Sequence, residues 1–414
     1  MKFTLNISSV FLVLIAFASC KSSDQEMKSG IWRAVLKTNS AAEIPFNFEV
    51  IDSAGAKYIN IINGEERFRV DEISFTSDSV FIKMPLFDSE IKAKNKGSVL
   101  SGQWIKHLAD SDAVMAFDAR AGDDWRFFKA SKSQEANISG RWSTTFTSLD
   151  SADTTIAVGE FRNDNGRLLG TFLTSTGDYR FLEGTVSDNK LYLSCFDGGH
   201  AYLFTANVLN DSTITDGKFY SGYAGVENWN ARKDENAILP DAYSLTALKK
   251  GYNKIDFTFP ALDGRKVSIL DEKYKNKIVL VQFLGSWCPN CMDETAYLVP
   301  FYNKYKDKGV EIIGLAYERT KDFERSRKNV SRLRDRFNVP YEMLITGYTN
   351  DKAEVATSIP MLNNFEAFPT LMIIDKKGVV RKIHTGFSGP GTGEYYTKFV
   401  QEFEQTIDDL LAEK

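Results

Sequence analysis

The first half of the chain alternates apolar and polar residues over many short runs. Residues 58–62, 79–84 and 190–194 are examples, and turns rich in Asn, Asp, Ser and Gly separate such runs. A period of two places the apolar side chains on one face of a strand, and closely spaced turns are typical of antiparallel meanders. Helical periodicity is nearly absent between residues 30 and 235. We therefore predict a mostly antiparallel β region.

A weak internal repeat divides this β region in two. Ser-Gly-Ile-Trp at residues 29–32 returns as Ser-Gly-Arg-Trp at residues 139–142. Two antiparallel meanders, each rolled into a small barrel or sandwich, would explain the recurrence. We place the two β repeats at residues 30–130 and 138–235.

The pattern changes after a predicted linker at residues 236–252. Continuous apolar runs now alternate with stretches of helical periodicity, which is typical of an α/β fold. The predicted order is strand, helix, strand, helix, two-stranded hairpin and closing helix, at Ile278–Leu284, Pro289–Tyr305, 310–317, 321–337, 371–375 with 379–384, and 394–411. Residues 253–414 are therefore predicted to form one α/β domain.

Two cysteines stand where the first of these strands gives way to the first helix, in the sequence Trp287-Cys288-Pro289-Asn290-Cys291. Cysteines with this spacing at a helix start lie close enough to form a disulfide. We expect Cys288 to face solvent, with its sulfur beside unpaired backbone N–H groups and the positive end of the helix dipole. Both favour the thiolate. Cys288 is thus the expected nucleophile, and Cys291, one turn further along, is the expected resolving thiol.

The remaining cysteines and the histidines do not complete a metal site. A structural zinc ion would need two further ligands, but Cys20 and Cys195 are remote and the three histidines are scattered. A purely structural disulfide across so short a loop would add little stability. We therefore predict redox chemistry with no metal and no cofactor. Cys195, in an alternating run, is expected to be a buried apolar side chain.

A second feature lies downstream, where Phe368-Pro369 directly precedes an apolar run at residues 371–375. Together with the Trp-Cys-x-x-Cys motif, it resembles the thioredoxin superfamily. Within that superfamily the chain is similar to the TlpA/ResA-like thiol-disulfide oxidoreductases of bacterial envelopes. The resemblance implies a thioredoxin-like fold for residues 253–414.

The resemblance also implies roles for particular residues. Cys288 and Cys291 would form a redox-active disulfide, and Pro369 would follow a cis peptide bond and face the dithiol. The backbone of Phe368 would pair with the bound partner. The residues implied to contact that partner flank the dithiol and the proline: Trp287, Pro289, Phe368 and Pro369.

Glu294, three residues after Cys291, stands where those proteins carry a glutamate beneath the active site. Two readings are open. It is either an ordinary solvated charge on a helix or a buried carboxyl group. In the second case burial would raise its pKa, and it could exchange a proton with Cys291 during resolution.

The amino terminus predicts export and a lipid anchor. Lys2 precedes an apolar run at residues 10–18, which is shorter than the roughly 20 residues of a membrane-spanning helix and suits a signal peptide at residues 1–19. The run ends in Phe-Ala-Ser-Cys, which resembles a bacterial lipobox with Cys20 as the lipidated residue. Residues 20–29 would then be a polar tether. The alternative is an ordinary cleaved secretory peptide in which Cys20 has no role.

Composition and location together limit the partners. The chain has 414 residues, a formal net charge of −4 and no basic cluster, which argues against nucleic acid. We predict a lipoprotein of the bacterial cell envelope, facing the periplasm or the outer membrane, where disulfides persist. Its partners would be disulfides or dithiols of envelope proteins and an electron donor of unknown identity. Pro289 resembles oxidising members of the superfamily, but the TlpA/ResA resemblance implies reductants, and we predict a reductase.

Two other functions stay open at this point. A thiol peroxidase of the AhpC/TSA type would carry a threonine three residues before its peroxidatic cysteine, where this chain has Gly285. A non-catalytic copper-binding module of thioredoxin fold would space its cysteines one residue further apart and add a distal histidine.

Overall fold

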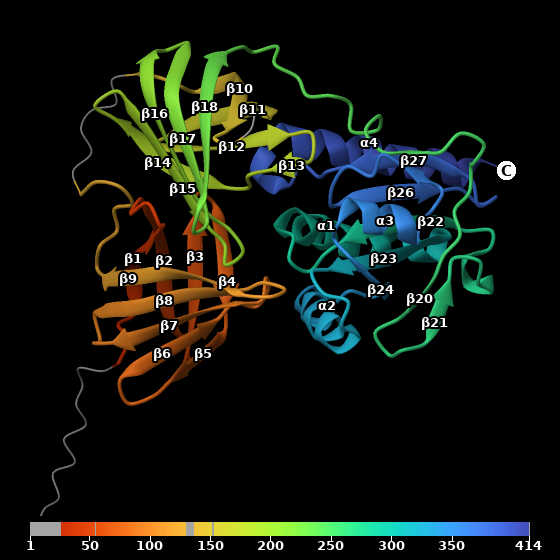
Figure 1. Ribbon diagram of the computed structural model, residues 1–414, viewed down its shortest axis with the longest axis horizontal. Coiled ribbons are helices and arrows are strands. Elements are labelled where there is room, and N and C mark those ends of the chain that lie inside the picture. Colours follow the sequence, from red (N-terminus) through yellow and green to blue (C-terminus); the bar gives the residue numbers. More distant parts are fainter. Residues whose placement is uncertain (1–25, 54, 130–135, 151–152, 414) are drawn as a thin grey trace, which may run out of the picture.

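The computed structural model describes residues 26–53, 55–129, 136–150 and 153–413. The predicted signal peptide and Cys20 lie outside these residues. Three sheet-containing bodies follow one another along the chain: two antiparallel β sheets, stacked at one side of Figure 1, and an α/β domain beside them. No helix in the described part of the chain is long and apolar enough to span a membrane.

The first β sheet has nine strands in the order β4-β3-β2-β1-β9-β8-β7-β6-β5. Its two edge strands, β4 and β5, are consecutive in the sequence with Asp71 alone between them, so the sheet curls back on itself. The strands are β1 (Gly30–Lys37), β2 (Glu43–Ser53), β3 (Ala56–Asn63), β4 (Glu66–Val70), β5 (Glu72–Phe75), β6 (Ser79–Lys83), β7 (Ser89–Asn95), β8 (Val99–His107) and β9 (Asp112–Ala121).

The second β sheet also has nine strands, in the order β11-β10-β18-β17-β16-β15-β14-β12-β13. An additional pairing of β11 with β12 closes it into a barrel, which removes exposed strand edges. The strands are β10 (Gly140–Ser148), β11 (Thr154–Asp164), β12 (Arg167–Thr174), β13 (Gly177–Asp178), β14 (Leu182–Ser187), β15 (Lys190–Phe196), β16 (Ala201–Asn210), β17 (Thr213–Ser221) and β18 (Gly225–Lys233).

The two sheets share one local detail. The indole N–H of Trp32 donates to the carbonyl of Lys28, and that of Trp142 donates to the carbonyl of Ile138, each over 2.8 Å. Both tryptophans are fully buried, and both belong to the recurring Ser-Gly-x-Trp sequence. The sheets close differently, however, so the internal repeat stays a prediction.

The C-terminal part has the thioredoxin-like fold that the sequence predicts. Its five-stranded sheet has the order β24-β23-β22-β26-β27, with β22, β23 and β24 parallel and the last two strands antiparallel. Its elements are β22 (Ile278–Leu284), α1 (Pro289–Tyr305), β23 (Val310–Glu318), α2 (Phe323–Phe337), β24 (Glu342–Thr349), α3 (Lys352–Ser358), β26 (Thr370–Ile374), β27 (Val380–Thr385) and α4 (Glu394–Ala412). The sequence prediction missed β24 and α3.

Alternate residues of the central strand β22 build two cores. Ile278, Leu280 and Leu284 pack with side chains of α1, α2 and α4. Val279, Val281 and Phe283 pack on the opposite face with α3 and the hairpin of β20 (Thr258–Pro260) and β21 (Lys266–Ser268). Every residue of β22 is buried because both faces are covered.

The segment predicted as a linker, residues 236–252, lies along the thioredoxin-like domain (Figure 1). Its strand β19 (Ala247–Leu248) pairs with β25 (Leu362–Asn363). The hydroxyl groups of Thr246 and Thr385 are hydrogen-bonded over 2.8 Å.

Candidate active site

Cys288 is the N-cap residue of α1, directly after the carboxyl end of β22. Its Sγ accepts a hydrogen bond from the backbone N–H of Cys291 over 3.2 Å, so the sulfur sits where the helix presents an unpaired donor. Both cysteines are free thiols. Burial raises the pKa of Cys291 well above its ordinary value, and the hydrogen bond to Cys288 adds to this.

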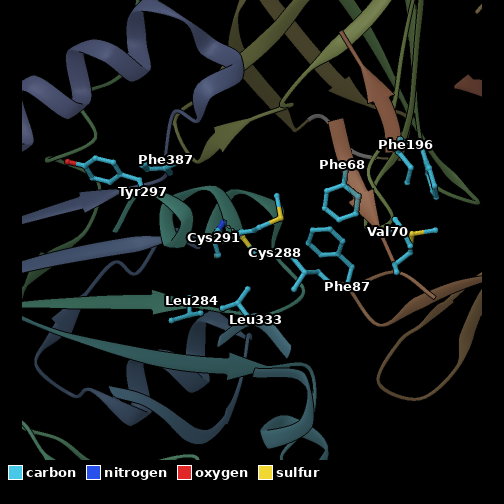
Figure 2. Packing of buried hydrophobic residues seen from close by; sticks show 14 of the residues in the cluster. Phe68, Val70, Phe87, Phe196, Leu284, Cys288, Cys291, Tyr297, Leu333 and Phe387 are labelled. Carbon is cyan, nitrogen blue, oxygen red and sulfur yellow. Dashed lines mark hydrogen bonds between the residues drawn. The ribbon is translucent and has the colours of Figure 1, made fainter. Parts of the chain in front are cut away.

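The prediction that Cys288 faces solvent is wrong. The residue is only 6% exposed because the β region packs over it. Phe68 and Phe87 point toward the dithiol (Figure 2), and both belong, with Val70, to the same buried cluster as Cys288 and Cys291. An apolar face of the β region thus covers the site.

The Phe368–Pro369 peptide bond is cis, as predicted. It precedes β26, and the carbonyl oxygen of Phe368 accepts from the Cys288 thiol over 3.7 Å. The ring of Phe368 contacts that of Trp287 edge-on, with centroids 5.6 Å apart. The two predicted recognition segments, 287–289 and 368–369, therefore meet at the nucleophilic sulfur.

Trp287 is held in place by its own hydrogen bond. Its indole N–H donates to the carbonyl of Tyr317 over 2.9 Å, and the indole lies against Gly285. A Cβ atom at Gly285 would be 2.1 Å from Nε1 of Trp287. No threonine fits there, so the site lacks the hydroxyl group that the thiol peroxidase alternative needs.

Of the two alternatives for Glu294, a solvated charge or a buried carboxyl group, the structure shows the second. It is fully buried in α1, and its Oε2 accepts a hydrogen bond from the side-chain amide of Gln282 over 2.8 Å. Its Oε1 has no hydrogen-bond partner among the described residues. Burial raises the pKa of Glu294 to about 8, and the Gln282 bond only partly offsets this. A carboxyl group with this pKa can hold or release a proton near neutral pH.

A cavity of about 270 Å³ opens above Cys288, and all three bodies line it. The thioredoxin-like domain contributes the dithiol loop, Phe368 and Arg319. The β region contributes Lys106 from β8, residues 174 and 176–179 around β13, and the aromatic pair His200 and Tyr202. Sequence analysis missed every one of these β-region residues, because no motif marks them.

Close packing fixes β13 against the dithiol loop. A Cβ atom at Gly177 would lie 2.3 Å from Nδ2 of Asn290. The residue has φ of +146°, which favours glycine. Any larger residue would push the second β sheet away from the Cys-Pro-Asn-Cys loop.

Arg180 joins the three bodies behind the dithiol. Its side chain is 2% exposed, and its guanidinium forms salt bridges with Glu66 of β4, with Asp197, and with Asp293 of α1. It also donates to the carbonyl of Pro289 over 3.4 Å. Although burial favours the neutral form, the three carboxylates raise the pKa of Arg180 well above its ordinary value. The guanidinium is therefore a charged link between the β region and the start of α1.

Helix α2 adds a second link to the first β sheet. Arg325 donates to the carbonyl of Leu108 over 2.8 Å, and Arg332 donates to Asp88 over 3.3 Å. These contacts and the salt bridges of Arg180 hold the β region against the thioredoxin-like domain, over Cys288. Within the described residues, no His, Cys, Asp or Glu side chains form a group of three or more that could hold a metal ion.

A free dithiol at a strand–helix junction, facing a cis-proline, defines a thiol–disulfide exchange enzyme of thioredoxin fold. Residues 249–398 match the Redoxin family. The thioredoxin-like protein YneN of Bacillus subtilis is 28% identical over 189 residues, which cover 45% of this chain and 90% of YneN. The thiol-disulfide oxidoreductase ResA of Geobacillus thermodenitrificans is 32% identical over 141 residues, which cover 34% of this chain and 72% of ResA.

The thioredoxin domain of a thiol-disulfide oxidoreductase from Bacteroides vulgatus is 25% identical, with a TM-score of 0.29, and the match covers 38% of this chain and 99% of that domain. The chain belongs to the ResA-like thiol-disulfide oxidoreductases of the thioredoxin superfamily.

Proposed function

We propose that this enzyme reduces disulfides of bacterial envelope proteins through its Cys288-Pro289-Asn290-Cys291 dithiol. The observation that carries the proposal is the position of Cys288. Its sulfur lies at the start of α1 and faces the Phe368 carbonyl beside cis-Pro369, with a protonatable carboxyl group, Glu294, in the same helix.

In the first step the Cys288 thiolate attacks one sulfur of the substrate disulfide. A bond forms between Sγ of Cys288 and that sulfur, the substrate S–S bond breaks, and the other substrate sulfur leaves as a thiolate that takes up a proton. The N–H of Cys291 stabilises the attacking thiolate. Trp287, Pro289, Phe368 and Pro369 hold the substrate chain on either side of the sulfur.

In the second step Cys291 resolves the mixed disulfide. Its thiol passes a proton to the ionised form of Glu294 and attacks Sγ of Cys288, which releases the second substrate thiolate. Two electrons have then moved from the dithiol to the substrate, and the enzyme holds a Cys288–Cys291 disulfide. Because burial raises the pKa of the Cys291 thiol, a neighbouring base with a pKa of about 8 is matched to this proton transfer.

An electron donor must then reduce the Cys288–Cys291 disulfide again. We propose a dithiol protein of the envelope as donor and a lipid on Cys20 as membrane anchor, which would keep the enzyme on the side of the membrane where protein disulfides persist. Support comes from the lipobox-like sequence at residues 17–20. Fatty-acid labelling that is lost in a Cys20→Ala variant, together with release from the membrane fraction, tests the anchor.

The reaction itself is tested in a single turnover. A reduced Cys20→Ser variant is mixed with insulin, quenched with acid and analysed by mass spectrometry. We expect one insulin disulfide to be lost for each Cys288–Cys291 disulfide formed. Oxidation at any other cysteine, or insulin disulfides left intact, would contradict the proposal.

A further inference from the structure

Two cations line the cavity above the nucleophile, and each comes from a different body. Lys106 belongs to β8 of the first sheet, and its ammonium group donates to the carbonyl of Gly199. Arg319 directly follows β23, and its guanidinium lies over the Trp287 ring, 5.2 Å from the centroid. Within the described part of the chain, neither forms a salt bridge.

The acidic groups near these cations have other partners. Asp178 lines the cavity, but its carboxylate accepts from the backbone N–H groups of Arg180 and Gly389. Glu318 accepts from the N–H and the hydroxyl of Ser286 over 2.8 and 2.7 Å. The cavity therefore presents positive charge that an anion can neutralise.

The two cations are only partly compensated by negative charge. Burial lowers the pKa of Lys106 to about 8, and Arg319 lowers it further, while Asp197, which already pairs with Arg180 and His200, opposes this. Burial also lowers the pKa of Arg319, and the negative groups that oppose this are Glu318 and Cys288. A carboxylate that entered the cavity would favour the charged form of both side chains.

The size of the cavity limits what enters. About 270 Å³ is slightly below the usual range of small-molecule sites, which begins near 300 Å³. It admits a short disulfide or the tip of an extended segment, whereas a flat protein surface cannot reach a cysteine that is 6% exposed.

We propose that this cavity selects disulfides that carry a carboxylate close to the sulfur atoms, with Lys106 and Arg319 as the specificity-determining residues. The inference rests on the proposed function and names its substrate class. The carboxylate binds the two cations and thereby places the neighbouring sulfur against Sγ of Cys288. That sulfur then bonds to Cys288, the substrate S–S bond breaks, and the leaving thiolate takes up a proton. Cys291 completes the two-electron transfer as before.

The experiment uses three disulfides of matched size. They are 3,3′-dithiodipropionate, bis(2-hydroxyethyl) disulfide and cystamine, which end in a carboxylate, a hydroxyl group and an ammonium group. Each is mixed with the reduced full-length protein in a single turnover, and each rate is divided by the rate for dithiothreitol with the same disulfide. We expect the anionic disulfide to react about tenfold faster than the neutral one, which corresponds to ~1.4 kcal/mol, and cystamine to react most slowly.

Variants of Lys106 test whether its charge causes the preference for the anionic disulfide. Lys106→Gln should slow the anionic disulfide roughly fivefold and leave the neutral one within about twofold, because only the charge interaction is lost. Lys106→Arg should keep the preference, and Lys106→Glu should reverse it. The matched control is Lys94→Gln, since Lys94 lies at the other end of the β7–β8 pair and is exposed. Thermal unfolding of each variant checks that it folds. Added salt should reduce the ratio of the rates for the anionic and the neutral disulfide in the wild-type protein.

Two peptide disulfides that differ only in Asp or Lys beside the cysteine identify the source of the carboxylate. Preference for the Asp peptide supports a protein segment, and preference confined to the small disulfides supports a free small molecule. Equal normalised rates for all probes would overturn the inference and leave the exchange reaction intact. A reduced protein that reacts with none of them would instead contradict the proposed function.

Discussion

The thioredoxin-like domain and the β region both form the walls around Cys288, but they do so from different kinds of sequence. The thioredoxin-like domain supplies residues 287–290 of the dithiol loop, Phe368 beside the cis-proline, and Arg319 directly after β23. The β region supplies Lys106, Gly177 and His200 from separate strands and loops. Chemistry is thus encoded locally, whereas access to it depends on both β sheets being folded and docked.

The largest expected effect on disulfide exchange concerns the dithiol of the thioredoxin-like domain. Cys288→Ser should reduce disulfide exchange to background, because Cys288 is the N-cap residue of α1 and neither of the other described thiols, Cys195 and Cys291, occupies such a position. Cys291→Ala should keep the attack and accumulate mixed disulfides, because the resolving thiol is gone. Non-reducing electrophoresis and mass spectrometry of the trapped adducts distinguish the two variants. Equal trapping by both would show that the roles are assigned wrongly.

The next effect concerns the docking of the β region. Arg180→Met keeps the side-chain length but leaves Glu66, Asp197 and Asp293 without their shared cation. Breaking a buried ion cluster on one side costs about 3–5 kcal/mol, so we expect a loss of this size in the free energy of unfolding. Denaturant titration measures it, and the rate at which a thiol reagent labels Cys288 should rise.

Arg162→Met is the matched control for this substitution. Arg162 lies in β11 of the same sheet and pairs with Glu65, but both side chains are more than half exposed. Exposed pairs contribute about 0–1 kcal/mol. If both variants lose the same free energy of unfolding, the Arg180 cluster is not what holds the β region over Cys288.

The contrast between the two regions also explains how much of the fold and of the site could be predicted from the sequence. The dithiol and the order of most elements in the thioredoxin-like domain follow from local patterns, and the cis-proline follows from the family resemblance that the motifs carry. The burial of Cys288 does not, because it depends on Phe68 and Phe87, more than two hundred residues away. No sequence motif marks Gly177 or Arg180, and only packing against α1 gives them a role at the site.

A smaller effect is expected at Glu294. Glu294→Gln keeps the shape but removes the proton acceptor, so resolution of the mixed disulfide should slow roughly 100-fold, the low end of general-base contributions. Attack by Cys288 should be unchanged. Rapid-quench measurement of the mixed disulfide and of the final Cys288–Cys291 disulfide separates the two steps. Equal slowing of both would mean that the variant disturbs the nucleophile instead.

The stability of the same variant should depend on pH in a defined direction. Burial raises the pKa of Glu294 from 4.5 to about 8 in the folded protein, so below pH 4.5 the group is neutral in both states. As pH rises toward 8 the unfolded chain releases the proton and the folded protein holds it, so wild-type stability falls by up to roughly 1.4 kcal/mol per pH unit. The wild-type minus variant difference in unfolding free energy should show this slope between pH 4.5 and 8. A flat difference would mean that Glu294 ionises freely in the fold.

The smallest effect compares two cysteines in the two regions. Cys195 lies in β15, is fully buried in the core of the second sheet, and has a pKa that burial raises well above its ordinary value. Its sulfur therefore stays a neutral thiol packed among apolar side chains, whereas the Cys288 sulfur receives an N–H at a helix start. Cys195→Ala should cost only ~1 kcal/mol of stability for the one atom removed and leave the exchange rate within about twofold. In the native protein a thiol reagent should label Cys288 first and Cys195 only on unfolding. Fast labelling of Cys195, or a large loss of disulfide exchange in the alanine variant, would mean that Cys195 is a third redox-active thiol. The β region would then take part in the reaction as well as controlling access to Cys288.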